Sequence, residues 1–334
     1  MSTRVFLTGI TGYLGGVLAE HLSRLPEVTA ITGIGPRPPR RPLPPKARFV
    51  PMDIRSPGVT GAMVGHDVVI HTAAVVLWRA SMTAAERDDI NLNGTRNVAQ
   101  AALANRVPRF LHASSMAVYD PHLVRGRSGV TEEFQLGRDD SYYYYWSTKA
   151  AVERTVVEVL AKSGMLLTLL RPIYIIGPRC RVTVKGLREN AVNLLGHNPR
   201  RQFVHEDDVA AAFIQALRAE MPGPYNVVPD DFIRMSEVWR IVGARWVPTA
   251  PLWLARWITW IRWKHLGSPI HPSWVEDMLV DFTGSNARLK AAGWAPRHSS
   301  AEALRSALQD PSAIAPQCDE TGRTGQQRRF RSRG

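Results

Sequence analysis

The sequence is poor in the residues that build covalent or metal-based frameworks. It has two cysteines among 334 residues, Cys180 and Cys318, which lie far apart and outside any ligand spacing. This excludes a disulfide framework and a cysteine zinc site, so we expect no metal. Unpaired thiols are typical of a reducing compartment, and no signal peptide precedes Arg4. We therefore expect a cytoplasmic protein.

The sequence also lacks an apolar run long enough to cross a membrane. The longest apolar stretch, residues 250–263, is interrupted by Arg256 and Arg262. A membrane-spanning helix needs about 20 largely uncharged residues. We therefore expect no membrane span.

Acidic residues are outnumbered, with 29 Asp and Glu against 42 Lys and Arg, for a formal net charge of +13. Residues 36–48 contribute +5 without an acid, and residues 311–334 contribute five arginines against two acids, or +3. No recognition helix, zinc-ligand set or aromatic platform accompanies this charge, so nucleic acid is not an expected partner. A basic patch for an anionic small molecule is favoured. We expect residues 311–334 to form a disordered basic tail.

Short apolar runs alternate with stretches of helical spacing. The expected strands are residues 5–7, 28–34, 47–52, 67–71, 109–113 and 166–170, and the expected helices are residues 13–25, 90–105 and 145–162. Residues 36–48 hold six prolines and predict an extended loop, and residues 120–141 look irregular. This alternation predicts the α/β class, with a doubly wound parallel sheet of the Rossmann type.

Glycines at positions 9, 12 and 15 stand between the first expected strand and helix. A pyrophosphate must approach the backbone amides at such a helix N-terminus, and side chains there would hold it away. The Gly-x-x-Gly-x-x-Gly turn therefore predicts dinucleotide binding. We expect a dinucleotide-binding domain at residues 1–172 with returns at about 205–229. A smaller C-terminal substrate-binding cap would take residues 173–204 and 230–310.

Two further patterns carry chemistry. Tyr145 and Lys149 are four residues apart, which places them on one face of a helix. A phenol titrates near pH 10, and a neighbouring ammonium lowers its pKa, so the pair is a candidate acid/base. Ser114 and Ser115 follow the strand at residues 109–113. They can hold a substrate carbonyl at the ligand-binding edge of the sheet or simply cap the strand end.

In combination, these motifs resemble the extended short-chain dehydrogenase/reductase family. That family includes NAD-dependent epimerases and dehydratases, 3β-hydroxysteroid dehydrogenases and ketoreductases. The resemblance covers about residues 4–300. It rests on the glycine turn, Asp53-Ile54-Arg55, His71-Thr72-Ala73-Ala74, Asn91-Leu92-Asn93-Gly94-Thr95, Ser114-Ser115, Tyr145 with Lys149, Arg171-Pro172 with Gly177-Pro178-Arg179, and His205-Glu206-Asp207-Asp208-Val209-Ala210.

The resemblance implies roles for individual residues. Tyr145 would exchange the proton, Lys149 would lower its pKa and bind the nicotinamide ribose, Ser115 would bond the reacting oxygen, and Asn91 would order a water relay to Lys149. The cofactor-binding residues it implies are Gly9, Thr11, Gly12, Tyr13, Leu14, Gly15, Asp53 and Ile54 beside the adenine, Ala73 and Ala74 beside the cofactor backbone, Lys149 and Pro172.

The end of the second strand bears on cofactor choice. NAD-preferring enzymes of this kind usually carry an acid there for the adenosine ribose. Here Gly33-Ile34-Gly35-Pro36 stands at that place, followed by Arg37, Arg40 and Arg41. Guanidinium groups suit a 2′-phosphate, so we expect NADP(H) in preference to NAD(H), with Arg37 as a cofactor ligand.

Departures from the family patterns bear on the substrate. Met116 and Ala117 follow Ser115 where dehydratases have acids, and Tyr174-Ile175-Ile176 replaces the asparagine of nucleotide-sugar enzymes. The insertion between Gly177 and His205 is also short for a nucleoside-diphosphate site. Eight tryptophans lie between residues 239 and 294. Together these favour a bulky apolar or aromatic ketone or alcohol, such as a sterol or a polycyclic polyketide of secondary metabolism.

The tryptophan-rich stretch at residues 250–263 leaves three interpretations open. On a helical wheel, Trp253, Leu254, Trp257, Ile258, Trp260 and Ile261 share one face. That face can pack on the core, line or cover an apolar substrate pocket, or lie on a membrane as a basic amphipathic helix. Packing on the core is the first expectation.

The sequence therefore predicts an NAD(P)H-dependent ketoreductase or alcohol dehydrogenase. A nucleotide-sugar epimerase or reductase is the alternative enzyme, and a non-catalytic cofactor-binding or sensor protein is the alternative from another class. Family members are often dimers through the helices near Ile90 and Tyr145, so a homodimer is an open expectation.

Overall fold

A parallel sheet forms the centre of the protein in the computed structural model, which describes residues 2–77, 81–124, 126–180, 184, 186–188, 191–268 and 270–309. Within these residues the sheet has seven strands in the order β12-β7-β5-β4-β1-β2-β3. They are β1 (Thr3–Thr8), β2 (Val28–Gly35), β3 (Ala47–Pro51), β4 (Val68–His71), β5 (Arg109–Ala113), β7 (Leu166–Pro172) and β12 (Gly223–Val227). All neighbouring pairs are parallel, which confirms the predicted doubly wound fold.

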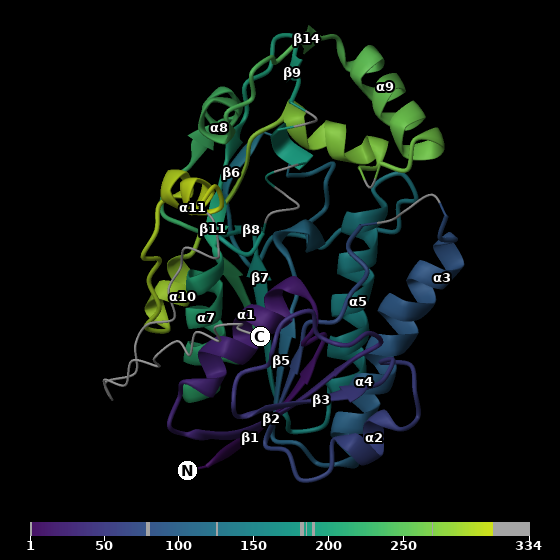
Figure 1. Ribbon diagram of the computed structural model, residues 1–334, viewed down its shortest axis with the longest axis vertical. Helices are drawn as coiled ribbons and strands as arrows, with labels where there is room; N and C mark the ends of the chain where they lie inside the picture. Colours follow the sequence, from purple (N-terminus) through teal and green to yellow (C-terminus); the bar gives the residue numbers. More distant parts are fainter. Residues whose placement is uncertain are drawn as a thin grey trace, which may run out of the picture.

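Helices cover both faces of this sheet (Figure 1). One face carries α1 (Tyr13–Ser23) and α7 (Glu206–Arg218), and the other carries α2 (Val59–Ala62), α4 (Gly94–Ala104) and α5 (Tyr144–Leu160). Alternate residues of β1 serve the two faces: Val5 and Leu7 pack with α1 and α7, whereas Phe6 packs with α4 and α5. This period of two is the reason the strands are apolar throughout.

The helix expected at residues 90–105 begins earlier than predicted. It starts as α3 (Ala84–Asp88), passes through a π-helical turn at Asp89–Asn93 and continues as α4. Thr83 and Glu86 form a capping box at the start of α3, a signal that the sequence reading overlooked. The π-helical turn widens the helix at Asn91, one of the predicted site residues.

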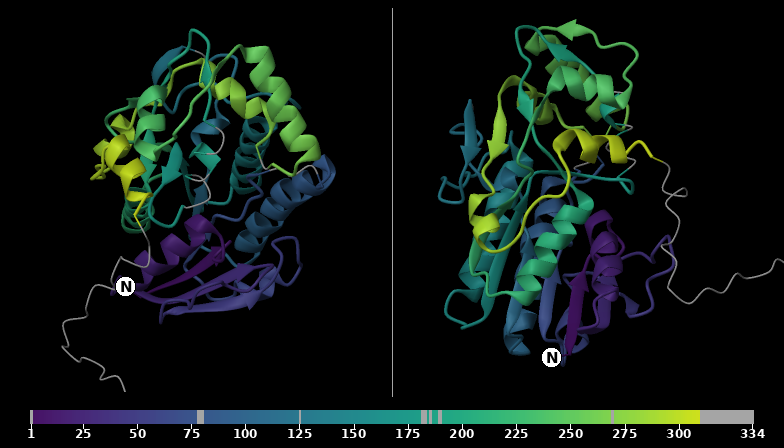
Figure 2. Two further views of the ribbon diagram at one scale, coloured as in Figure 1. Left: turned by 45° about the horizontal axis from the view of Figure 1, so that its top comes forward. Right: turned by 90° about the vertical axis from the view of Figure 1, so that its left-hand side faces the viewer.

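The remaining elements gather beyond the carboxyl edge of the sheet (Figure 2). A second sheet has the order β13-β10-β15-β6. Its strands are β13 (Ile233–Arg234), β10 (Arg200–Arg201), β15 (Phe282–Gly284) and β6 (Arg127–Val130). Two small pairs are β8 (Tyr174–Ile176) with β11 (Phe203–His205), and β9 (Asn193–Leu194) with β14 (Thr249–Ala250). The region predicted to be irregular, residues 120–141, thus supplies strand β6.

Helical segments lie around these strands: α8 (Met235–Val242), α9 (Leu252–His265), the 3₁₀ segment η3 (Pro272–Leu279) and α11 (Ser300–Ser306). The short 3₁₀ turn η2 (Met116–Val118) follows β5, and α10 (Ala287–Ala291) packs against β12 of the central sheet, beside α7 (Figure 1). No helix among the described residues has the length and apolar character needed to span a bilayer. The predicted disordered tail, residues 311–334, lies outside the described residues.

The orientation of α9 contradicts the first expectation for the tryptophan-rich stretch. Its tryptophan face is exposed to solvent, with Trp253, Trp257 and Trp260 being 69%, 58% and 45% exposed. The buried residue of the helix is Ala255, on the other side. Arg256 explains this orientation, because its guanidinium pairs with the carboxylate of Glu276, which is buried on η3.

A buried polar network joins strands β5, β7 and β12 to helix α5. Arg171 on β7 pairs with Glu153 on α5, and Ser114 donates to the same carboxylate. Arg171 also donates to the hydroxyl of Tyr119, which donates in turn to the Asn226 side chain on β12. All five side chains are buried. The network therefore holds α5, which carries Tyr145 and Lys149, at a defined position on the sheet.

We predict that Arg171→Ala lowers the free energy of unfolding by about 3–5 kcal/mol, because it leaves the Glu153 carboxylate buried without its counter-charge. Urea unfolding would measure this loss. Arg218→Ala is the control, since it breaks an ion pair with Glu27 at the protein surface and should cost far less. Equal losses for the two variants would contradict the role given to the network.

Candidate active site

The turn between β1 and α1 is closed by contacts that glycine alone permits. Gly9 has φ +75°, in the left-handed region, and a Cβ on it would lie 2.9 Å from the Ala73 amide nitrogen. A Cβ on Gly15 would lie 2.1 Å from the carbonyl oxygen of Gly9. The Gly12 amide donates to that same oxygen at 2.8 Å. The turn and the first helical turn of α1 are thus in direct backbone contact.

The N-terminus of α1 is open to an anion. Its N-cap residue, Gly12, offers no side-chain cap, and the first turn of the helix carries no acid. The unpaired amides and the positive end of the helix dipole remain available to a phosphate. Thr11 and Leu14 are partly exposed beside them. These residues fit the pyrophosphate of a dinucleotide.

The side chain of Tyr13 bonds to the protein and not to the helix N-terminus. Its hydroxyl donates to Glu206 at 2.6 Å, and Arg179 pairs with both Glu206 and Glu20. Glu206 is fully buried. This cluster joins α1 to the start of α7 and engages the Tyr13 hydroxyl, so a contact of Tyr13 with a cofactor stays a prediction. Pro172, another predicted cofactor residue, is buried at the end of β7.

The edge of the sheet beyond the turn is basic and lacks an acid at the predicted ribose position. Strand β2 ends at Gly35, and Arg37, Arg40 and Arg41 follow with exposed side chains. A Cβ on Gly35 would lie 2.9 Å from the Thr11 hydroxyl, so the strand end packs directly on the glycine turn.

The loop after β3 is held by a local ion-pair network. Arg55 donates to the Asp53 carboxylate at 2.9 Å and to Asp89 at 2.7 Å, and its hydrogen bonds lower the pKa of Asp53. Ile54 is buried, and a Cβ on Gly94 would lie 2.6 Å from its side chain. Asp53 and Ile54 therefore anchor the loop to α4, and their contact with an adenine stays a prediction.

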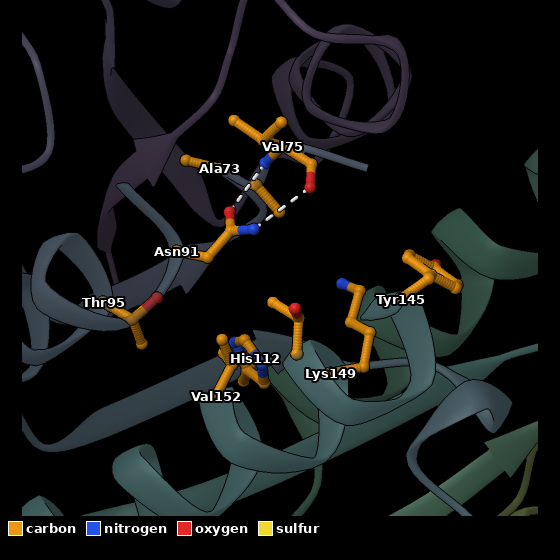
Figure 3. A pocket seen from close by; sticks show the side chains of 10 residues that line it. Ala73, Val75, Asn91, Thr95, His112, Tyr145, Lys149 and Val152 are labelled. Atoms are coloured by element: carbon orange, nitrogen blue, oxygen red, sulfur yellow. Dashed lines mark hydrogen bonds between the residues drawn. The ribbon is translucent and has the colours of Figure 1, made fainter. Parts of the chain in front are cut away.

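A cavity at the carboxyl edge of the sheet brings together many of the predicted residues (Figure 3). It lies between the segment after β4 and helix α5. Its lining residues are Ala73, Ala74, Val75, Asn91, Thr95, His112, Tyr145, Thr148, Lys149 and Val152. Five of these were singled out from the sequence, and they come from three separate stretches of chain. The cavity is the candidate active site.

Lys149 projects into this cavity from α5 (Figure 3). Burial lowers its pKa to about 8, and nearby Glu153 opposes that shift. Its ammonium donates to the Ala113 carbonyl at 3.4 Å. With a pKa near 8, the amine is mostly charged at neutral pH and close to proton exchange. This is the property that the acid/base interpretation of the Tyr145 and Lys149 pair requires.

Asn91 faces Lys149 across the cavity (Figure 3). Its side-chain oxygen accepts from the Val75 amide at 2.7 Å, and its side-chain nitrogen donates to the Val75 carbonyl at 3.1 Å. The side chain is thus engaged in holding the segment after β4. The amide keeps one further N–H and one further lone pair, which a water relay at this position could use.

Ser115 is not among the cavity-lining residues. Its hydroxyl accepts from the Ala117 amide at 3.1 Å and caps the 3₁₀ turn η2 that follows the strand. An accepting hydroxyl keeps its own proton, so Ser115 can still donate a hydrogen bond. A role toward the substrate stays a prediction.

His112 is one of the site residues that sequence reasoning did not find. His112 lines the cavity and stacks on His71 with ring centroids 5.4 Å apart. Burial lowers the pKa of both histidines, and the Lys149 charge lowers them further. Neither ring nitrogen of His112 has a hydrogen-bond partner within the described part of the chain. His112 stands near the end of β5, directly before Ala113 and the two serines that were predicted as site candidates.

Trp274 beside Tyr145 was also missed. Its ring stacks on Tyr145 with centroids 5.2 Å apart and an angle of 29°, and its indole nitrogen donates to the Tyr144 hydroxyl. Trp274 lies on η3, more than 120 residues after Tyr145. No local pattern distinguished it from the other tryptophans of the C-terminal region.

The glycine contacts make a direct prediction. Gly15→Ala should weaken dinucleotide binding at least about tenfold, because its Cβ would push α1 away from the turn that holds the phosphates. Gly16→Ala is the matched control, since its Cβ would meet only the Ile10 carbonyl at 3.7 Å. Fluorescence titration with NADPH and NADH measures both affinities. Equal affinity of the two variants would argue against the phosphate site.

Comparisons with known proteins agree with this fold and site. The model of the "NAD dependent epimerase/dehydratase family" matches residues 5–228. An uncharacterized protein of Sinorhizobium fredii is 27% identical over 318 residues, covering 89% of this chain and 76% of that protein. A 3-beta-hydroxysteroid dehydrogenase of Mycolicibacterium neoaurum is 29% identical over 202 residues, covering 58% of this chain and 53% of that enzyme.

Solved structures show the same fold at low identity. A UDP-galactose 4-epimerase superposes with a TM-score of 0.70 at 22% identity, covering 93% of this chain and 99% of that one. The UDP-glucose 4-epimerase of Thermotoga maritima gives a TM-score of 0.72 at 16% identity, covering 92% and 98%. MoeE5, solved with UDP-glucuronic acid and NAD, gives 0.70 at 20% identity, covering 91% and 97%. The chain therefore belongs to the NAD dependent epimerase/dehydratase family, the extended short-chain dehydrogenases/reductases that its motifs predicted.

Proposed function

We propose that the protein is an NADPH-dependent ketoreductase acting on a bulky apolar or aromatic carbonyl compound. The family makes it an NAD-dependent enzyme of the epimerase/dehydratase type, and the proposal adds reaction and substrate. The observation that carries it is the position of Tyr145. Its ring lies against the Trp274 indole, on the same helix face as buried Lys149. A proton donor packed against an indole suits an apolar substrate.

Carbonyl reduction needs a hydride at carbon and a proton at oxygen. The dinucleotide supplies the hydride from its nicotinamide when bound. The Tyr145 hydroxyl donates the proton to the carbonyl oxygen, and the Lys149 ammonium stabilises the phenolate that remains. Ser115 would donate a hydrogen bond to the same carbonyl oxygen. Asn91 would order the water that returns a proton to Lys149.

Two structural features support an apolar substrate in preference to dehydration or a nucleotide sugar. The two residues after Ser115 are Met116 and Ala117, and both are buried. No carboxylate therefore stands where a dehydratase needs one. Tyr174-Ile175-Ile176 forms strand β8, paired with β11, and brings no amide toward a nucleotide. The sterol dehydrogenase relative is also compatible with this substrate class.

A nucleotide-sugar epimerase is the second candidate. It is favoured by the similarity of nearly the whole chain to UDP-sugar epimerases. An epimerase would regenerate its bound cofactor in each cycle, whereas a ketoreductase consumes NADPH. A panel of bulky ketones and UDP- or TDP-sugars, followed by NADPH absorbance and product analysis, separates the two.

The proposed proton donor has a matched test. Tyr145→Phe should lower kcat at least about 100-fold, the usual scale for a general acid, while NADPH affinity stays within about twofold. Tyr142→Phe is the control, because its hydroxyl bonds Glu276 on η3 at 3.1 Å instead. Wild-type turnover by Tyr145→Phe would refute the assignment, as would an equal loss in both variants.

The cofactor preference is tested at the basic loop. Replacing Arg37, Arg40 and Arg41 together by alanine should raise KM for NADPH about tenfold or more and leave KM for NADH nearly unchanged, because only NADPH carries the 2′-phosphate. Arg305→Ala, an exposed arginine on α11, controls for the lost positive charge. Wild-type rates with NADH that equal those with NADPH would overturn the preference.

A further inference from the structure

Helix α9 exposes its apolar face to solvent. The exposed side carries Trp253, Trp257, Ile258 and Trp260, all between 44% and 69% exposed. The opposite side contacts the protein through Ala255, which packs with Leu194 and Val275. Large exposed apolar side chains that share one face of a helix are typical of interaction surfaces.

The position of the helix leaves this face accessible. In Figure 1, α9 lies at the end of the molecule opposite α2, and in the left view of Figure 2 it again lies along the outer surface. The protein side of the helix is occupied by η3, to which Arg256 is fixed through Glu276. The tryptophan face therefore cannot turn inward as a cover for the cavity without breaking that buried pair.

The charged residues around the helix indicate which kind of partner this face binds. Between Glu237 and Glu276 the sequence has no acidic residue and five Lys and Arg residues. Two of them, Arg240 and Arg256, pair with these flanking glutamates, which leaves Arg245, Arg262 and Lys264. Lys264 is exposed on the tryptophan side of α9, whereas Arg262 is partly exposed on the opposite side of the helix. A second copy on a two-fold axis would bring these like charges together. An anionic surface would pair with them.

We propose that the outward face of α9 docks on an anionic membrane surface. Exposed indole rings are the side chains that settle at the boundary between headgroups and acyl chains, and flanking Lys and Arg reach the phosphates. With 14 residues, the helix is about 21 Å long, so it lies in the interface and does not cross the bilayer.

Docking at α9 would also orient the candidate active site. The helix rests on η3, and Trp274 of η3 stacks on Tyr145. One short segment, η3, thus connects the proposed membrane-binding helix to the proposed proton donor. An apolar substrate dissolved in the bilayer would reach the cavity from this side. The docking itself does not depend on the proposed substrate, and it is tested without turnover.

Vesicle flotation of the full chain tests the proposal. The full chain should float with vesicles of equal parts phosphatidylcholine and phosphatidylglycerol and much less with phosphatidylcholine alone. Replacing Trp253, Trp257 and Trp260 together by serine should lower the partition coefficient about tenfold or more, because the apolar contact is lost. Lys264→Glu should weaken binding to the anionic vesicles selectively. The melting temperature and NADPH affinity should be unchanged in both variants.

Val64→Ser is the control, since Val64 is 63% exposed beside α2 at the other end of the molecule. The arginines of residues 311–334 remain in every variant. Flotation that persists in the triple variant would therefore assign binding to those arginines and overturn the proposal. Absence of flotation by the wild type would overturn it as well. Light scattering gives a third outcome: a wild-type dimer that the triple variant converts to monomer, without vesicle binding, would assign the face to a second copy.

Discussion

The contact of Gly15 with the Gly9 carbonyl governs the arrangement of the nucleotide half of the site. A single Cβ at Gly15 would come within 2.1 Å of that oxygen, so α1 can start at the carboxyl edge of the sheet only with glycine there. The helix N-terminus then presents its free amides where a pyrophosphate can reach them. The cluster of Tyr13, Glu206 and Arg179 ties the same helix to α7 and keeps it in that position.

The catalytic half depends on helix α5 in a comparable way. Tyr145, Lys149 and Glu153 follow one another at intervals of four residues along one face. Glu153 is bound by Arg171 and Ser114, which fixes the register of the helix against β5 and β7. Burial lowers the pKa of Lys149 and the charge of this carboxylate raises it, so the two together set the pKa. The acid/base property is a consequence of where the helix is anchored.

The sequence predicted the parts of this site that depend on local spacing. The glycine turn, the Tyr145 and Lys149 step and the alternation of strands with helices are all short-range patterns, and the fold bears out the parallel sheet they indicate. The pairing of β6 with β15 and the stacking of Trp274 on Tyr145 join residues more than 100 positions apart. The helical wheel of residues 250–263 correctly separated the two faces of α9. Periodicity alone, however, does not indicate which of the two faces packs against the rest of the protein. The buried carboxylate of Glu276 decides that, through Arg256.

Deuterium transfer tests the proposed carbonyl reduction most directly. The protein would be incubated with NADPH dideuterated at the nicotinamide C4 and a bulky aromatic ketone, and the alcohol would be analysed by mass spectrometry. Reduction by direct hydride transfer predicts one deuterium atom in each alcohol molecule, bound to the former carbonyl carbon. Alcohol without deuterium would contradict it. Interconversion of UDP-sugars without net oxidation of NADPH, and with no ketone reduced, would contradict it equally and assign the site to an epimerase.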